Sequence, residues 1–320
     1  MSSLPARAGV PDAVLFDLGG VLLGWDPALA FADEMDPALV PAYLETIGFG
    51  TWNREVDAGR TFAEVEADLR ERLPEHAGAV PAYRRHFART LTGMVPGTGA
   101  VLAELGQRGT RLAALTNWSA ETFPLARERF GLLSRFEGVL VSGEERLAKP
   151  DPRIFTLALS RFGLVAQRTV FVDDSPANVE AAASLGLVAL PFTGAERLRA
   201  DLVGLGLLGP RPVVEGPLHH LTERDRWEQA QAAGSYPWST RGRGYEAEGF
   251  VHLSSPAQLD GSRRRFFGDL ADADLVVLEL DPARLSAPVV VEDLGAGPFP
   301  HLYGPLRPDE VVRVHAYPLA

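Results

Sequence analysis

Cysteine is absent from this sequence of 320 residues. Its absence excludes disulfide bridges, catalysis by a thiol, and zinc or iron–sulfur sites held by thiolates. Lysine is almost absent too, because Lys149 is the single lysine among 31 basic residues and all the others are arginine. No run of about 18 apolar residues occurs, so the sequence predicts no membrane span. The N-terminus also lacks the apolar run of a signal peptide, and we therefore expect a cytoplasmic protein.

Positive charge is not in excess either. The formal net charge is −11, which argues against a nucleic-acid backbone or an anionic membrane as the main partner. Apolar residues make up 46% of the chain, enough to build packed cores. At about 100–200 residues per domain, the length predicts two domains. The sequence makes no prediction of the oligomeric state.

Strand and helix signals alternate over the first 200 residues. Short apolar runs predict five strands, at residues 13–17, 111–116, 138–142, 169–173 and 187–190. Helical patterns lie between them, at residues 98–108, 151–162 and 175–186. This alternation predicts an α/β fold with a doubly wound parallel sheet. Residues 27–92 interrupt it, and their pattern predicts a helical insertion without strands.

A segment rich in glycine and proline at residues 208–216 predicts a linker. We therefore expect the α/β domain to span residues 1–207 and a second domain to span residues 217–320. The second domain has the pattern of a small α+β fold. Its strands are expected at residues 218–221, 250–253, 275–280, 289–291 and 311–316, and its helices at 223–233 and 256–267.

Polar residues follow the predicted strands of the first domain. Asp17 ends the first strand, Thr116 and Asn117 the second, and Asp173 and Asp174 the fourth. The single lysine stands just before a predicted helix, after the third strand. Ligands of open parallel sheets bind beyond the carboxyl ends of the strands, so these groups are expected to converge. Adjacent acids directly after a buried strand are costly without a cation, which points to a metal ion.

Four segments carry a family resemblance: FDLGGVL, LTNWS, KPDPRIF and VFVDDSPANVEAAASLG. In this order they are similar to the four motifs of the haloacid dehalogenase superfamily, over about residues 12–200. The helical insertion resembles that family's type-one cap. The branch that the chain most resembles contains sugar phosphatases and the N-terminal domains of epoxide hydrolases.

The resemblance implies a Mg²⁺-dependent phosphatase that acts on a small phosphorylated metabolite, such as a sugar phosphate. Asp17 would be the nucleophile and would form an aspartyl-phosphate. Thr116 and backbone N–H groups near Asn117 would bind the phosphoryl oxygens. Lys149 would lie between the Asp17 carboxylate and the phosphate, where a compact ammonium fits better than the planar fork of arginine.

The implied Mg²⁺ site has few protein ligands, as is usual for this ion. The carboxylates of Asp17 and Asp174 and the backbone carbonyl of Gly19 would hold the ion. Asp173 would lie behind them and support the site.

Gly19 is also a departure from the family pattern. Most phosphatases of the superfamily have a second Asp at this position, which protonates the leaving oxygen and later activates water. Three enzymatic interpretations follow: hydrolysis without this acid, an acid supplied by the insertion, or displacement of a halide from a 2-haloacid. The candidates for a replacement acid are Asp26, Asp57 and Glu55. A non-enzymatic alternative is a regulator that binds a phosphorylated ligand with little turnover.

Histidines mark the second domain, at His220, His252 and His301. The segments around them resemble the domain-of-unknown-function family numbered 952, over about residues 216–318. For that family a distant similarity to the ADP-ribosyltransferase fold implies a nucleotide pocket lined by His220 and by the 250–254 strand, which includes Ser254. The alternatives are histidines satisfied within the core, a turn at His301, or a zinc site. Three arginines at 263–265 predict a solvated helix face, or a contact to a nucleotide phosphate.

Overall fold

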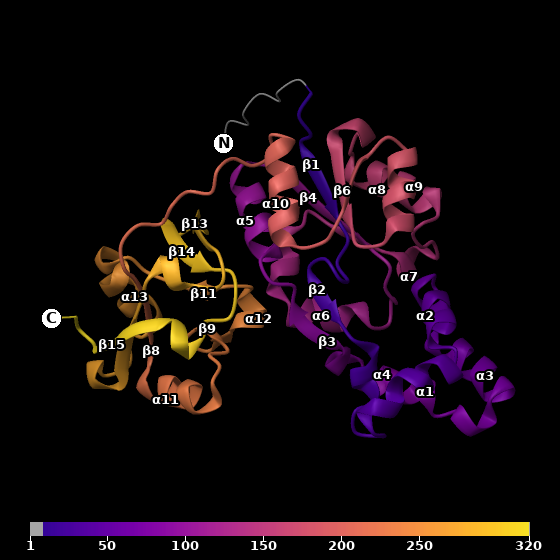
Figure 1. The fold of residues 1–320 in the computed structure, drawn as a ribbon, viewed down its shortest axis with the longest axis horizontal. Helices are drawn as coiled ribbons and strands as arrows, with labels where there is room; N and C mark the ends of the chain where they lie inside the picture. Colours follow the sequence, from indigo (N-terminus) through magenta and orange to yellow (C-terminus); the bar gives the residue numbers. More distant parts are fainter. Residues whose placement is uncertain (1–8, 320) are drawn as a thin grey trace. The chain divides into compact units, whose positions relative to one another are not determined.

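The computed structural model describes residues 9–319 (Figure 1). The N-terminal segment, for which the sequence analysis expects no signal peptide, lies partly outside the described residues. The chain forms two compact units. The first unit extends to Val95 and continues with residues 109–129 and 133–208. The second unit starts at Gly209 and also includes residues 130–132 and 96–108, which contain α5 (Thr98–Gln107).

A five-stranded sheet with the order β5-β4-β1-β6-β7 forms the centre of the first unit. All neighbouring strands are parallel, which confirms the predicted α/β class with a doubly wound sheet. The strands are β1 (Ala13–Phe16), β4 (Arg111–Thr116), β5 (Val139–Val141), β6 (Thr169–Asp173) and β7 (Val188–Pro191). Four of them are almost fully buried, as apolar strands covered on both faces must be.

Helices surround this sheet. Phe155 of α8 packs against Phe171 of β6, and α9 contacts both β6 and β7 (Figure 1). The helices of this layer are α6 (Phe123–Arg129), α7 (Ser142–Glu145), α8 (Pro152–Phe162), α9 (Pro176–Ser184) and α10 (Ala195–Gly204). Asp151 caps α8 through its side chain, and Gly163 ends it in the left-handed conformation.

The insertion is a cap of four α-helices, which lie together beyond one end of the sheet (Figure 1). They are α1 (Val40–Thr46), α2 (Phe49–Asp57), α3 (Phe62–Arg72) and α4 (Ala79–Thr90). A short antiparallel pair, β2 (Leu23–Trp25) with β3 (Leu91–Met94), joins the cap to the rest of the unit. The sequence analysis missed this pair, because three or four residues are too short for a recognisable alternation.

The second unit is built on antiparallel sheets of three strands, in the orders β15-β12-β8 and β11-β14-β13. This confirms the predicted small domain after the α/β fold. The strands are β8 (Leu218–Glu223), β9 (Trp238–Thr240), β10 (Arg243–Gly244), β11 (Val251–His252), β12 (Leu275–Leu280), β13 (Val289–Asp293), β14 (Pro298–Leu302) and β15 (Val311–Ala316). The helices are α11 (Arg224–Ala233), α12 (Tyr245–Glu248) and α13 (Leu259–Phe266).

The sequence analysis also missed β14, and it considered a turn at His301. Pro298 and Pro300 argue against a strand, because proline lacks the N–H of a sheet ladder. In the structure both prolines have a pairing partner only in β13, and only His301 and Leu302 are paired with β11 as well. His301 is therefore a residue of a central strand. No helix within residues 9–319 is both long and apolar enough to cross a membrane.

Candidate active site

The ammonium of Lys149 lies at the carboxyl end of the sheet, between two carboxylates. Its Nζ is 2.8 Å from Asp17 Oδ1 and 2.6 Å from Asp173 Oδ2, and the lysine side chain is fully buried. These residues come from the end of β1, the loop before α8 and the end of β6. The convergence expected from the strand-end pattern is therefore present.

Asp17 is held in one orientation. Its Oδ1 accepts hydrogen bonds from the Lys149 ammonium and from the Leu18 N–H, which is 2.7 Å away. Burial raises the pKa of the Asp17 carboxyl to about 6, and the charge of Asp173 adds to the rise, while Lys149 opposes it. The site thus concentrates negative charge that one ammonium does not fully compensate.

The two neighbouring acids differ in their surroundings. Asp173 is buried, and both of its oxygens accept hydrogen bonds: from Lys149, from the Ser175 N–H at 2.8 Å, and from the amide of Asn178 at 3.0 and 3.1 Å. Asp174 is exposed to a cavity, and burial and the Asp173 charge raise the pKa of its carboxyl. Asp173 thus orients Lys149, while Asp174 remains available to a ligand.

The carboxylates suit a divalent ion. Asp17, Asp173 and Asp174 each offer an oxygen, and these oxygens lie within 4.8 Å of one another. Hard oxygen donors with space for water are the set that Mg²⁺ prefers. Gly19 lines the cavity beside them. Gly20 has a φ of +73°, and a Cβ there would lie 2.2 Å from Asp174 Oδ2, so only glycine allows this close approach.

Thr116 and Asn117 take different parts in the site. The Thr116 hydroxyl is buried, and Oγ1 has no hydrogen-bond partner within residues 9–319. A buried hydroxyl without a partner is costly, and a bound oxygen ligand would satisfy it. The Asn117 side chain instead binds the Lys149 backbone, donating to its carbonyl at 2.9 Å and accepting from its N–H at 2.8 Å. Asn117 therefore positions the loop that carries the lysine.

A cavity of about 830 Å³, including its open mouth, lies over these groups and reaches the cap. Its lining combines the acids with aromatic rings, which are those of Trp25, Phe62, Tyr83, Phe87 and Trp118. The indole N–H groups on this side of the cavity already have hydrogen-bond partners. Trp118 donates to Thr122 Oγ1 at 3.2 Å, and Trp25 is hydrogen-bonded to Tyr83. The aromatic side of the cavity is therefore largely apolar.

Of the three candidate replacement acids, only Asp57 lines this cavity. Asp26 instead caps a short 3₁₀ helix by accepting from the Ala28 N–H, and Glu55 pairs with Arg60 at 2.7 Å. Burial raises the pKa of the Asp57 carboxyl to about 7, the Asp17 charge adds to the rise, and a hydrogen bond from the Ser119 N–H opposes it.

Asp57 is also fixed to the sheet domain through its backbone. The buried Ser142 hydroxyl donates to the Asp57 carbonyl at 2.5 Å, and the same Ser142 oxygen accepts from the Trp118 N–H at 2.9 Å. On its side chain, Oδ2 accepts from the Asn53 amide at 3.1 Å. The acid at the end of α2 is thus held over the strand-end loops, and no pattern in the sequence indicates this contact.

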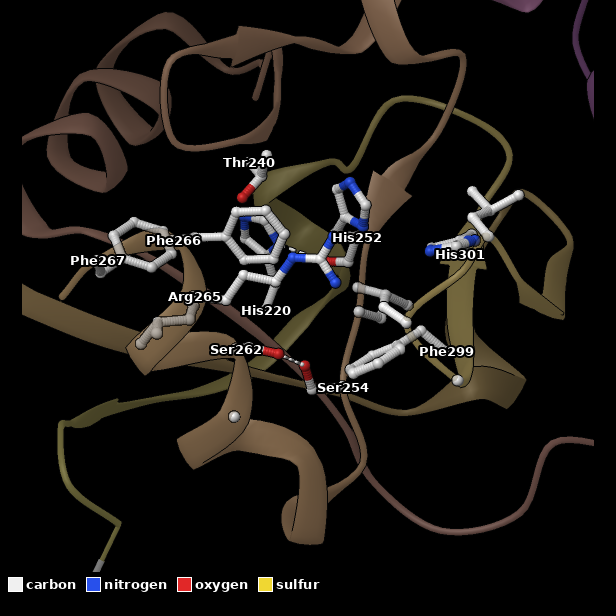
Figure 2. A pocket seen from close by; sticks show the side chains of 16 residues that line it. His220, Thr240, His252, Ser254, Ser262, Arg265, Phe266, Phe267, Phe299 and His301 are labelled. Carbon is white, nitrogen blue, oxygen red and sulfur yellow. Dashed lines mark hydrogen bonds between the residues drawn. The ribbon is translucent and has the colours of Figure 1, made fainter.

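The candidate residues of the second unit surround a separate pocket (Figure 2). His220 uses both ring nitrogens within the protein, at 2.7 Å from the His252 carbonyl and 2.7 Å from the Tyr236 hydroxyl. His301 Nδ1 pairs with Glu292 at 3.0 Å, and the Ser254 hydroxyl is 2.8 Å from that of Ser262. His220 thus fits the alternative of a satisfied core histidine.

Removing the lysine tests whether the acids depend on it for stability. We expect Lys149→Met to lower the free energy of unfolding by about 3–5 kcal/mol, because two buried carboxylates lose their shared cation. Urea denaturation with EDTA present measures the loss. Adding Asp173→Asn should restore part of the stability, since it removes one of the uncompensated charges. A loss below about 1 kcal/mol in the single variant would show that the ammonium does not neutralise the acids.

Residues 11–186 match the family model described as haloacid dehalogenase-like hydrolase. The chain belongs to this hydrolase family. Residues 221–314 match a second model, described as protein of unknown function (DUF952). The chain is therefore a haloacid dehalogenase-like hydrolase with a C-terminal DUF952 domain.

Several curated proteins are similar to this hydrolase. Acyl-CoA dehydrogenase family member 10 of Mus musculus is 31% identical over 63% of this chain and 20% of its own length. The phosphoserine phosphatase of Thermus thermophilus is 39% identical over 35% of this chain and 47% of its own length. The sesquiterpene phosphatase astK of Aspergillus oryzae is 29% identical over 57% of this chain and 89% of its own length. The chain thus spans about a fifth and about half of the first two relatives.

Proposed function

We propose that the first unit hydrolyses phosphate monoesters of small metabolites. The observation that carries this proposal is the fully buried Lys149 ammonium, which holds Asp17 beside a solvent-open cavity. Such a cation next to a carboxylate allows a second anion to approach it. Two of the similar proteins are named as phosphatases, which supports the same reaction.

The proposed reaction has two steps. The Asp17 carboxylate attacks phosphorus and forms an aspartyl-phosphate, while the bond from phosphorus to the leaving oxygen breaks. That oxygen takes the proton of Asp57. A water molecule then attacks the phosphorus of the aspartyl-phosphate, and the bond from phosphorus to the Asp17 oxygen breaks. Asp57 accepts the proton of that water, inorganic phosphate leaves, and the Asp17 carboxylate is restored. Asp57 thus does the work of the acid that is missing at Gly19.

The carboxylates of Asp17 and Asp174 and the Gly19 carbonyl would hold Mg²⁺, with Asp173 supporting Lys149. When bound, this ion supplies positive charge opposite the phosphoryl oxygens. The Thr116 hydroxyl, which has no partner in the described part of the chain, would donate to one of these oxygens. Lys149 balances the charge of Asp17 as the phosphate approaches.

The cavity favours a substrate whose leaving group has a flat or apolar face. Its aromatic side offers mainly ring faces, as described above. The polar side chains there include those of Asn53, Ser119 and Thr122, which already bind Asp57, the Glu121 N–H and Trp118. A sugar can stack one face on these rings, but its remaining hydroxyl groups would lose hydrogen bonds to water.

A panel of phosphate esters with and without Mg²⁺ tests the proposal. We expect the purified chain to release inorganic phosphate with Mg²⁺ and to lose this activity in EDTA. Aryl and prenyl phosphates should have a higher kcat/KM than hexose phosphates of similar size, by roughly 10-fold, because an apolar contact of one or two methylenes contributes about that much. A colorimetric phosphate assay gives both results.

Other outcomes of this panel would contradict the proposal. Release of halide from 2-haloacids, unchanged in EDTA, would establish a dehalogenase instead. Binding of phosphate esters without release of phosphate would establish a binding protein. Equal turnover of hexose and prenyl phosphates would contradict the apolar substrate class, but not the phosphatase reaction.

A further inference from the structure

The pocket of the second unit has a volume of about 680 Å³, including its open mouth. It lies between α13, the β11 strand and the loop that joins β13 to β14 (Figure 2). Its side-chain lining includes no aspartate and no glutamate. In a chain with a net charge of −11, a pocket that contains an arginine and no acid is an exception.

Three consecutive arginines of α13 have different surroundings. Arg263 binds the backbone carbonyls of Phe267 and Leu270 and pairs with Asp272 at 2.9 Å. Arg264 and Arg265 are both exposed, and Arg264 does not line the pocket. Arg265 lines it, and within residues 9–319 its guanidinium has neither an ion pair nor a hydrogen bond. Its contact is with the ring of Phe266, 5.3 Å from the centroid.

The side chains of Arg265 and His252 both line this pocket (Figure 2). The His252 ring has aromatic neighbours but, in the part of the chain that the structure describes, no hydrogen-bond partner for its nitrogens. Burial lowers the pKa of His252 to about 3, and the nearby positive groups add to the decrease. The Thr240 hydroxyl also faces this space without a described partner. The pocket thus combines a cation with a neutral imidazole and a hydroxyl, all available to a ligand.

Aromatic rings form the other side of the pocket. Phe266 lies beside His252 at a centroid distance of 5.6 Å, and Phe299 lines the opposite part of the pocket (Figure 2). Planar rings of this kind stack on flat ligands. His220, Ser254 and His301 complete the lining with groups that are already hydrogen-bonded inside the domain, so they provide shape rather than free polar atoms.

We propose that this pocket binds a small molecule that carries both an anionic group and a planar ring. Arg265 binds the anion, and Phe266, Phe299 and His252 contact the ring. An arginine without a partner at the mouth of an acid-free pocket is suited to a phosphate or a carboxylate. The site is independent of the catalytic cavity, because none of its residues lines that cavity.

Calorimetric titration of the full chain in EDTA tests this proposal with AMP as the probe. Adenosine and ribose 5-phosphate serve as probes for the ring alone and the anion alone. We expect AMP to bind more tightly than either. Arg265→Ala should weaken AMP binding by about 10-fold or more, because a hydrogen bond to a charged group is lost. Arg265→Lys should retain part of the affinity, since it retains the charge.

Arg264→Ala is the matched control, since it removes the same charge from the adjacent position of the same helix. It should change AMP affinity by less than about 2-fold, as expected for a screened surface charge. Phe299→Ala should weaken AMP but not ribose 5-phosphate. The proposal is overturned if Arg264→Ala and Arg265→Ala act equally, if adenosine binds as well as AMP, or if millimolar AMP produces no heat.

Discussion

Asp17→Asn is expected to abolish phosphate release. The neutral amide that replaces the carboxylate cannot form the acyl phosphate. Asp173 also contacts Lys149, but its side chain is buried and does not line the cavity, so it cannot replace Asp17 as the nucleophile. In the wild type, acid quenching during turnover should leave a hydroxylamine-sensitive phosphate on the peptide that contains Asp17. The variant should show no such label.

The matched control is Asp12→Asn. Asp12 lies just before β1, at the opposite end of the strand from Asp17, where it is exposed and pairs with Arg168 at 2.5 Å. This variant should retain the wild-type rate. Residual turnover by Asp17→Asn at more than about 1% of wild type, well above the rate expected without the nucleophile, would show that another group attacks phosphorus.

Asp57→Asn is expected to lower kcat by about 10²–10⁴-fold, the usual contribution of a general acid or base. Asparagine has nearly the same size as aspartate and can still form hydrogen bonds, but it cannot deliver a proton to the leaving oxygen. Glu55→Gln is the control on the same helix, because Glu55 pairs with Arg60 and does not line the cavity. Its rate should stay near that of the wild type. Equal losses in the two variants would assign the effect to the cap helix rather than to the acid.

Adding an acid at Gly19 gives a sharper form of this second prediction. A Cβ at Gly19 would meet no heavy atom within 4 Å, so Gly19→Asp introduces a carboxyl without a clash. Combined with Asp57→Asn, it should recover at least about 10-fold of the lost rate, as a repositioned acid would. No recovery, with the fold intact, would show that Asp57 has another role.

The pKa of Asp57 gives this acid a pH signature. With burial raising that pKa to about 7, the carboxyl holds its proton below this pH and loses it above. Turnover of alkyl phosphates, whose leaving oxygen needs a proton, should therefore decline as the pH rises through about 7. Esters with an acidic leaving group, such as p-nitrophenyl phosphate, should not show this decline in the rate of the first step.

Local patterns account for what the sequence predicted well. The buried strands β4 and β6 coincide with the predicted ranges, because a short apolar run between helical segments is a local signal. The short pairs β2–β3 and β9–β10 carry no such signal, and β14 contains two prolines, so these strands were missed. The sites were likewise predicted only where a local signal exists: position after a predicted strand indicated Asp17, Lys149 and Asp174.

The sequence by itself determined the α/β class and the group of acids around one lysine, because the strands and their ends follow from the chain's own periodicity. Its four ordered motifs indicated the family. Only the tertiary structure showed that Asp57, and neither Asp26 nor Glu55, lines the cavity, since the Ser142 contact that positions Asp57 joins residues 85 positions apart. It also showed that His220 is satisfied within the protein and that Arg265, unlike Arg263 and Arg264, lines a pocket. Contacts between distant segments determine which of several chemically similar side chains faces a cavity. Local sequence patterns do not reveal these contacts.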